Sequence, residues 1–182
     1  TVMATKISVI IPTYAPKDYL WECLGSLENQ TLSKDEFEVI LVLNGEREPY
    51  ESLIQKKLPE YSFNSTLLYS TPNGVSRARN LGMEKAQGCH ICFIDDDDWV
   101  SDNYLEDLLS KACDNGIVEA NVKDVDEVTR EESEQHFLSR AYKNYQPEKE
   151  SSLFVNRSFF SSACCKLLPK NCINGQRFDT NI

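Results

Sequence analysis

Ile7-Ser8-Val9-Ile10-Ile11 is a run rich in β-branched residues near the start of the 182-residue chain, and Pro12 follows it. A run this apolar suits a central parallel strand, because such a strand is buried on both faces. Pro12 has no N–H to donate to a neighbouring strand, so we expect the strand to stop there. The sequence therefore predicts a buried parallel strand over residues 7–11.

Helical and strand-like patterns alternate along the chain after this run. Helices are expected over residues 17–30, 50–58, 76–87 and 104–112, and further strands over 37–43, 65–69, 90–94 and 116–122. Alternation of this kind is typical of βαβ units with right-handed crossovers. The predicted fold class is α/β: a Rossmann-like, mostly parallel sheet flanked by helices in a single domain. Residues 123–152 are dominated by charge, so we interpret them as an insertion or lid-like segment.

Composition agrees with one globular domain and excludes several functions. Hydrophobic residues make up 41% of the chain and charged residues 26%, and a chain of this size can bury about 70% of its unfolded surface without a disulfide or metal. The formal net charge of −10 argues against a nucleic-acid binder, which needs surplus Lys and Arg to displace phosphate counterions. No apolar run approaches the roughly 20 residues of a membrane span.

The ends of the chain and its cysteines bear on its cellular context. No secretory leader is recognisable, so we expect a cytoplasmic protein whose seven cysteines are reduced. The Cys89–Cys92 pair lacks the further ligands that a zinc site needs. Because the chain begins at Thr1 rather than Met and stops at Ile182, we expect a fragment of a longer protein.

Four consecutive carboxylates, Asp95 to Asp98, follow the apolar run 91–94. At an effective dielectric constant of about 20, two unit charges about 4 Å apart interact by about 4 kcal/mol, so such a cluster is costly without a counter-charge. Mg²⁺ typically binds one or two carboxylates together with phosphate oxygens, and it would link this acidic chain to an anionic substrate. The alternative is a solvated acidic turn in which Asp98 or Asp102 caps the next helix.

The segment Gly74-Val75-Ser76-Arg77-Ala78-Arg79-Asn80 leads into an expected helix, with Ser76 as its N-cap and Gly88 just after its C-terminus. Free N–H groups at a helix N-terminus attract phosphate, and arginine binds phosphate through two hydrogen bonds. Arg77 and Arg79 point to different sides of a helix, so at most one faces a site. Ordinary surface arginines are the alternative interpretation.

Ligands of open α/β sheets bind beyond the carboxyl ends of the strands. Four expected strand ends should therefore meet along one edge of the sheet: residues 12–14, 44–46, 71–74 and 95–98.

Five segments, in this order and spacing, resemble the family 2 glycosyltransferases of the GT-A fold. They are Val9-Ile10-Ile11-Pro12-Thr13-Tyr14, residues 23–30, Phe37-Glu38-Val39-Ile40-Leu41-Val42, residues 74–88 and Phe93-Ile94-Asp95-Asp96-Asp97-Asp98-Trp99. The resemblance covers about residues 6–122 and is weaker at 166–169 and 177–179. It implies one GT-A domain over residues 1–182, with a nucleotide-sugar-binding half at 6–122 and part of an acceptor-side region at 123–182.

The resemblance also implies an activity: transfer of a sugar from a nucleotide-sugar, usually a UDP-sugar, with inversion at the anomeric carbon and help from Mn²⁺ or Mg²⁺. The acceptor would be a glycan or a lipid-linked molecule in cell-surface polysaccharide synthesis. A lipid-linked acceptor would bring a cytoplasmic enzyme to the inner face of the membrane as a peripheral protein.

Carried over position by position, the resemblance assigns roles to nine residues. Those expected to bind nucleotide or substrate are Pro12, Thr13, Tyr14, Asn44, Arg79, Asp95 and Asp96, with Asp95 near the ribose and Arg79 near the phosphates. Asp97 is expected to bind the metal. Asp98 is the catalytic candidate, as a carboxylate behind the metal or on the acceptor side.

Two departures from the family pattern bear on this assignment. Asn44-Gly45-Glu46 stands where the family often has a pair of acids, although Asn44 can still hydrogen-bond a base edge and Glu48 is a later acid. The family's general base usually follows a segment like Arg177-Phe178-Asp179, and no such motif is evident before Ile182. An inverting transfer needs a base to deprotonate the acceptor hydroxyl.

Four further residues have side chains that could take part in catalysis or binding. His90 and His136 pair with no evident nucleophile and are expected to be structural or to lie at the surface. Trp99 is expected to pack beneath the site rather than to stack on a sugar. Asp179 could approach the acceptor, although we favour no role for it.

Three other functions compete with this interpretation. The first is a non-catalytic module of the same fold that binds a nucleotide or a partner protein. A receiver-like phospho-switch would need an acidic pair after its first strand, where this chain has Pro12-Thr13-Tyr14. A nucleotidyltransferase would need a glycine-rich basic loop there, which Ala15-Pro16-Lys17 does not supply.

Overall fold

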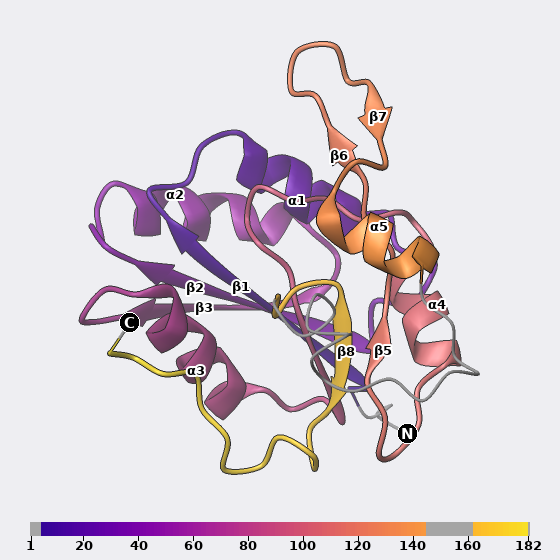
Figure 1. Ribbon diagram of the computed structural model, residues 1–182. Coiled ribbons are helices and arrows are strands. Elements are labelled where there is room, and N and C mark those ends of the chain that lie inside the picture. The colour runs from indigo at the N-terminus through magenta and orange to yellow at the C-terminus, as the bar shows by residue number, and fades with distance from the viewer. Residues whose placement is uncertain (1–4, 145–161, 182) are drawn as a thin grey trace.

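A six-stranded sheet forms the centre of the protein (Figure 1). The computed structural model describes residues 5–144 and 162–181. The strands of this sheet lie in the order β3 (Asn64–Ser70), β2 (Phe37–Asn44), β1 (Ile7–Tyr14), β4 (His90–Phe93), β8 (Lys166–Pro169) and β5 (Val118–Glu119). The first four strands are parallel, so the predicted α/β fold with a mostly parallel sheet is confirmed.

Helices cover both faces of the sheet. They are α1 (Tyr19–Glu28), α2 (Tyr50–Lys57) with the 3₁₀ turn η1 (Leu58–Glu60), α3 (Val75–Lys85), α4 (Tyr104–Ser110) and α5 (Phe137–Asn144). In Figure 1, α1 and α2 lie on one face of the sheet and α3 lies on the other. The predicted helices therefore exist, each shorter than its apolar pattern suggested.

The strand β1 carries the core on both of its faces. Ile7, Val9 and Ile11 pack into the larger cluster, which includes the buried residues of α1, α2 and α4. Ile10 points to the opposite face and packs with Ala78 of α3. All four isoleucine and valine side chains of this run are fully buried, as the continuous apolar pattern predicts.

Pro12 does not end the first strand, contrary to our expectation, because β1 continues to Tyr14 with Pro12 opposite Val42. The Ile10 carbonyl accepts a hydrogen bond from the Ile94 amide, so the backbone N–H and C=O groups of Ile10 and of every second residue after it are directed toward β4. Pro12 shares that direction but lies beyond the end of β4 at Phe93. Its missing N–H therefore removes no ladder hydrogen bond.

The ends of α3 also differ from expectation. Gly74, with φ of 141°, is the N-cap, and Ser76 lies inside the first turn. The helix ends with Ala86 as its C-cap rather than with Gly88 as the following residue. Gly88 is instead packed against the first strand, where an added Cβ would lie 2.6 Å from the Ser8 amide nitrogen.

The strand β8 was not predicted. It pairs antiparallel with β4 on one side and with β5 on the other, so residues far along the chain complete the sheet. The strand expected over 116–122 is only Val118–Glu119, because its partner β8 is short and limits the pairing. Lys166 of β8 is buried and forms an ion pair with Glu119 at 3.1 Å.

The segment that we interpret as an insertion begins with a small hairpin, β6 (Asp124–Val125) and β7 (Glu132–Ser133), and continues into α5. The hairpin projects from the rest of the molecule in Figure 1. Residues 145–152 of the expected insertion lie outside the described residues. Within the described ranges, no helix combines the length and apolar character required to cross a membrane.

Two helical glycines provide a test of the contact between α3 and the sheet. A Cβ added at Gly82 would lie 2.4 Å from Cγ2 of the buried Ile10, whereas one at Gly25 in α1 would meet nothing within 4 Å. Replacing glycine by alanine in a helix contributes about 0.5–1 kcal/mol of stability in open space, but overpacking a core costs about 1–3 kcal/mol. We expect Gly25→Ala to raise the urea midpoint and Gly82→Ala to lower it. Equal midpoints for the two variants would contradict the close packing of α3.

Candidate functional site

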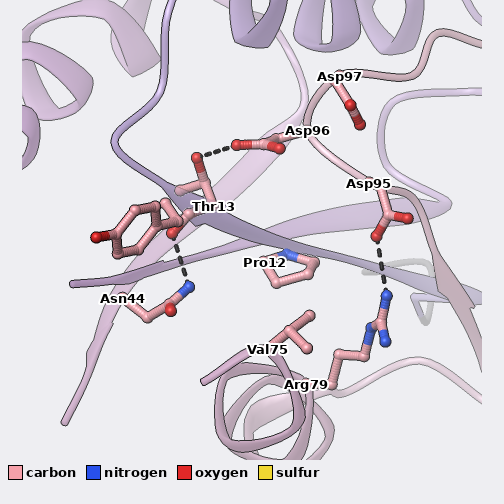
Figure 2. Close-up of a pocket in the computed structure, with 9 residues that line it drawn as sticks. Pro12, Thr13, Asn44, Val75, Arg79, Asp95, Asp96 and Asp97 are labelled. Carbon is pink, nitrogen blue, oxygen red and sulfur yellow. Dashed lines mark hydrogen bonds and ion pairs between the residues drawn. The ribbon is translucent and has the colours of Figure 1, made fainter. Parts of the chain in front are cut away.

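A cavity of about 420 Å³ opens at the carboxyl edge of the sheet. The chain runs from β1 to β2 and β3 on one side and returns to β4 on the other, so the connections that follow the neighbouring strands β1 and β4 lead in opposite directions from this edge. Such a switch point is where open α/β sheets bind ligands. The residues that line the cavity are Pro12, Thr13, Tyr14, Asn44, Val75, Arg79, Asp95, Asp96 and Asp97 (Figure 2). Eight of the nine site residues expected from the sequence are among them, and Asp98 is the exception.

Asn44, the last residue of β2, connects the end of β1 and the N-terminus of α3 at the cavity. Its side chain is buried; Nδ2 donates to the Thr13 carbonyl at 2.8 Å, and Oδ1 accepts from the Gly74 amide at 3.3 Å. The amide is thus engaged with the backbone of β1 and of the N-terminus of α3. This network fixes the backbone around the cavity.

Tyr14 presents an open aromatic face at the rim, with 61% of its surface exposed. Its ring lies over Gly45, where an added Cβ would come within 2.4 Å of the ring carbon Cε2. Gly45 also has φ of 98°, a conformation that side chains other than glycine rarely adopt. The positive φ is thus the reason that the turn after β2 favours glycine, and the small residue lets the Tyr14 ring pack closely over it.

The three cavity carboxylates have different partners. Asp95 Oδ1 accepts a hydrogen bond from Arg79 Nη2 at 2.9 Å, and Asp96 Oδ2 accepts one from the Thr13 hydroxyl (Figure 2). Burial raises the pKa of Asp96, an effect that the Thr13 hydrogen bond opposes. Among the described residues, no side chain forms a hydrogen bond or ion pair with the Asp97 carboxylate, which makes it the carboxylate best able to bind an added cation.

The donor set fits a divalent cation shared with a ligand. No group of three or more His, Cys, Asp or Glu within the described residues is arranged to hold a metal by itself. Mg²⁺ normally takes only one or two protein carboxylates when phosphate oxygens complete its shell. Asp97 supplies one such carboxylate at the cavity, and the remaining ligands would come largely from phosphate and water.

Arg79 is a positively charged side chain that lines the cavity. Its side chain is 16% exposed, and beyond the bond to Asp95 its buried Nε has no hydrogen-bond partner among residues 5–144 and 162–181. Arg77 instead points toward the Thr180 carbonyl, 3.5 Å from its Nη2. The expectation that at most one of these arginines faces the site is confirmed.

Asp98 does not line the cavity. It lies in a turn that is closed by a hydrogen bond from its own amide to the Asp95 carbonyl, at 3.1 Å. Although the residue keeps more than a third of its surface exposed, burial of the carboxyl group is the main cause that raises its pKa to about 6. The Asp95 and Asp97 charges add to the rise, and His136 opposes it. Asp98 and Asp102 do not cap the next helix, whose N-cap is Asn103.

His136 approaches Asp98 from the segment before α5, a placement that its sequence context did not suggest. His90 lies in β4, as expected of a structural residue.

Trp99 does not pack beneath the site, contrary to our expectation. Its surface is 42% exposed, and the Arg130 guanidinium lies 4.6 Å from its ring centroid. Arg130 comes from the turn between β6 and β7 and also pairs with Glu22 of α1 at 3.2 Å. The hairpin is thus held beside the acidic turn.

Cys164 is a neighbour of the site that the sequence did not reveal. It is buried, and its backbone pairs with that of Phe93 at the end of β4. Burial and the nearby Asp95 carboxylate both raise the pKa of its thiol. All seven cysteines are free thiols. Asp179 does not line the cavity, and its Oδ1 accepts a hydrogen bond from the Asn181 amide.

Comparison with known proteins identifies one family. The family model described as Glycosyl transferase family 2 matches residues 8–170. Glycosyltransferase GlyA of Streptococcus pneumoniae is 34% identical over 106 residues, which are 58% of this chain and 15% of that protein. Poly(ribitol-phosphate) beta-N-acetylglucosaminyltransferase TarS of Staphylococcus aureus is 31% identical over 105 residues, which are 58% of this chain and 18% of TarS. The chain therefore spans less than a fifth of either relative.

Solved structures show the same fold. Residues 1–349 of S. aureus TarS, in complex with UDP, superpose with a TM-score of 0.73 at 23% identity, over 96% of this chain and 50% of that one. A mannosyltransferase of Pyrobaculum calidifontis, in complex with GDP-Man and Mn²⁺, gives a TM-score of 0.59 at 23% identity, over 67% and 36% of the two chains.

The raised pKa of Asp98 predicts how its replacement changes stability with pH. An acid whose pKa is raised on folding binds its proton more tightly in the folded state, so its ionisation destabilises the fold as pH rises through about 6. We expect Asp98→Asn to be more stable than the wild type at pH 7.5, and the difference to shrink as pH falls toward 4, where both side chains are neutral. Urea unfolding across this range, with a metal chelator present, measures it. A difference that does not vary with pH would contradict the shift.

Proposed function

The chain belongs to glycosyl transferase family 2, and from that premise we propose that its cavity binds the nucleotide diphosphate part of a UDP-sugar and transfers the sugar with inversion. The observation that carries this proposal is the convergence of Tyr14, Arg79 and Asp97 on one cavity at the switch point. An aromatic face, a guanidinium and a carboxylate with no side-chain partner in the described part of the chain suit a base, a phosphate and a cation in turn. Relatives solved with UDP or UDP-GlcNAc support the choice of nucleotide.

Each residue has a definite task in this proposal. Tyr14 offers its exposed ring to the base, and Asn44 holds the loops beneath it. Arg79 orients a phosphate, or the ribose next to it, while its bond to Asp95 keeps the guanidinium in place. Asp97 and Asp95 would hold Mn²⁺ or Mg²⁺, which when bound stabilises negative charge on the leaving diphosphate.

Inversion defines the bonds that change. An acceptor hydroxyl oxygen forms a bond to the anomeric carbon from the face opposite the diphosphate, and the bond to the diphosphate oxygen breaks with its electron pair. The acceptor proton must pass to a base. Asp98 belongs to the acidic turn, and His136 approaches it from the segment before α5; we propose that this is the acceptor side.

The acceptor that we propose is a glycan or a lipid-linked molecule of cell-surface polysaccharide synthesis. The support comes from relatives, among them TarS, which is named for poly(ribitol-phosphate), and GgaB of Bacillus subtilis, which is named for minor teichoic acid biosynthesis. An enzyme of this kind would work on the cytoplasmic face of the membrane as a peripheral protein.

Calorimetric titration with UDP and then GDP, with and without Mn²⁺, tests the nucleotide and the metal together. We expect UDP to bind at least about tenfold more tightly with Mn²⁺, a gain of about 1.4 kcal/mol, and Asp97→Asn to abolish that gain. Asp114→Asn, an exposed carboxylate outside the cavity, is the matched control and should keep it. If a folded protein bound no nucleotide, the site would belong instead to a non-catalytic module that binds a partner.

The two arginines of α3 form a second matched pair. Lysine keeps the charge but not the planar guanidinium that binds phosphate through two hydrogen bonds. We therefore expect Arg79→Lys to weaken UDP binding by roughly tenfold, in line with the loss of one charge-assisted hydrogen bond, and Arg77→Lys to change it by less than about twofold. Equal losses in the two variants would show that the charge of α3, rather than Arg79 itself, attracts the nucleotide.

A further inference from the structure

The segment Arg177–Thr180 has no regular secondary structure, yet it is held firmly along α3. Asn80 makes two hydrogen bonds to one residue: its Nδ2 donates to the Phe178 carbonyl at 3.0 Å, and its Oδ1 accepts from the Phe178 amide at 2.8 Å. A side-chain amide thus takes the place of a neighbouring strand. Arg177 adds an ion pair to Glu84 at 3.7 Å.

This docking carries the Phe178 ring under the donor site. The ring packs edge-on against Phe93 of β4, with 5.4 Å between the centroids, and joins the core cluster on the α3 face of the sheet. The Arg79 guanidinium lies 5.5 Å from the Phe178 ring centroid and 6.0 Å from that of Phe93. Two aromatic rings therefore confine the cation that lines the cavity.

Arg79 needs this confinement because few polar contacts hold it. Its bond to Asp95 is made by one terminal nitrogen, and its Nε is buried without a hydrogen-bond partner in the described part of the chain. A cation over an aromatic ring gains about 0.5–2 kcal/mol, with the larger value where water is excluded. The rings thus compensate in part for a guanidinium that is otherwise poorly satisfied.

We propose that Phe178, docked on α3 by Asn80, is a positioning residue for nucleotide binding: its ring holds the Arg79 guanidinium in the orientation that the cavity requires. The proposal rests on the proposed function, in which Arg79 binds the nucleotide. It couples the donor site to a segment that is remote in sequence and has no contact with the cavity itself.

The first test needs no ligand. In an NMR spectrum of ¹⁵N-labelled protein, the Arg79 Nε–H resonance, assigned through Arg79→Lys, should be displaced by the currents of the two rings. We expect Phe178→Leu, which keeps apolar bulk but has no ring, to move it toward the position of a free arginine. Phe178→Tyr keeps the ring and should leave the resonance near its wild-type position.

The second test measures UDP affinity by calorimetry in the same variants. We expect Phe178→Leu to weaken binding by roughly 3- to 10-fold, the equivalent of one cation–π contact, and Phe178→Tyr to stay within about twofold. In an Arg79→Met background, where no cation remains for the ring to hold, Phe178→Leu should have less than about a twofold further effect, because residues that act through one another are not additive. Asn80→Ala should reproduce the loss seen in Phe178→Leu.

The outcomes separate the two proposals. An Arg79 resonance unchanged by Phe178→Leu overturns the positioning role, as do equal effects of leucine and tyrosine or the same loss in the Arg79→Met background. Wild-type protein that binds no UDP overturns the proposed function, while the Arg79 resonance still decides whether Phe178 positions the guanidinium.

Discussion

Repulsion among the four carboxylates of Asp95 to Asp98 is the interaction to which the rest of the site is fitted. The buried strand β4 leads directly into them, so the chain cannot spread them apart. Three of the carboxylates differ in their surroundings: Asp95 accepts a hydrogen bond from Arg79, Asp96 accepts one from Thr13, and Asp98 has a raised pKa. Asp97 lines the cavity with no such side-chain partner among the described residues, and under the proposed function it would bind the cation that accompanies a nucleotide diphosphate.

The parallel half of the fold could be predicted because its signals are local. The run Ile7–Ile11 is apolar on both faces, and each later strand or helix has its own periodicity. The predicted strand end at Pro12 was wrong because the effect of a proline depends on where the neighbouring strand ends, which the sequence does not show. β8 could not be foreseen, since a four-residue strand that pairs with segments far away in sequence leaves little periodicity of its own.

The cavity-lining residues could be anticipated from topology and resemblance together, because the carboxyl ends of parallel strands converge at one edge. Residues that come to the site from other elements could not. His136 and Cys164 approach the acidic turn from segments whose position depends on tertiary packing, and Trp99 was misjudged because its partner, Arg130, lies on a distant hairpin. Aromatic and acidic residues beside a motif do not reveal which face of the turn they occupy.

The position of β8 between β4 and β5 has a consequence for the order in which the chain is made. While the ribosome synthesises the protein, β1 to β4 can assemble as a parallel sheet, but β4 remains an edge strand with unpaired backbone groups. An exposed edge of this kind is a template for pairing with other chains. The edge is closed only once Lys166–Pro169 has emerged, so a nascent chain that stalls earlier presents the apolar β4, directly before the acidic turn, to chaperones and to other nascent chains.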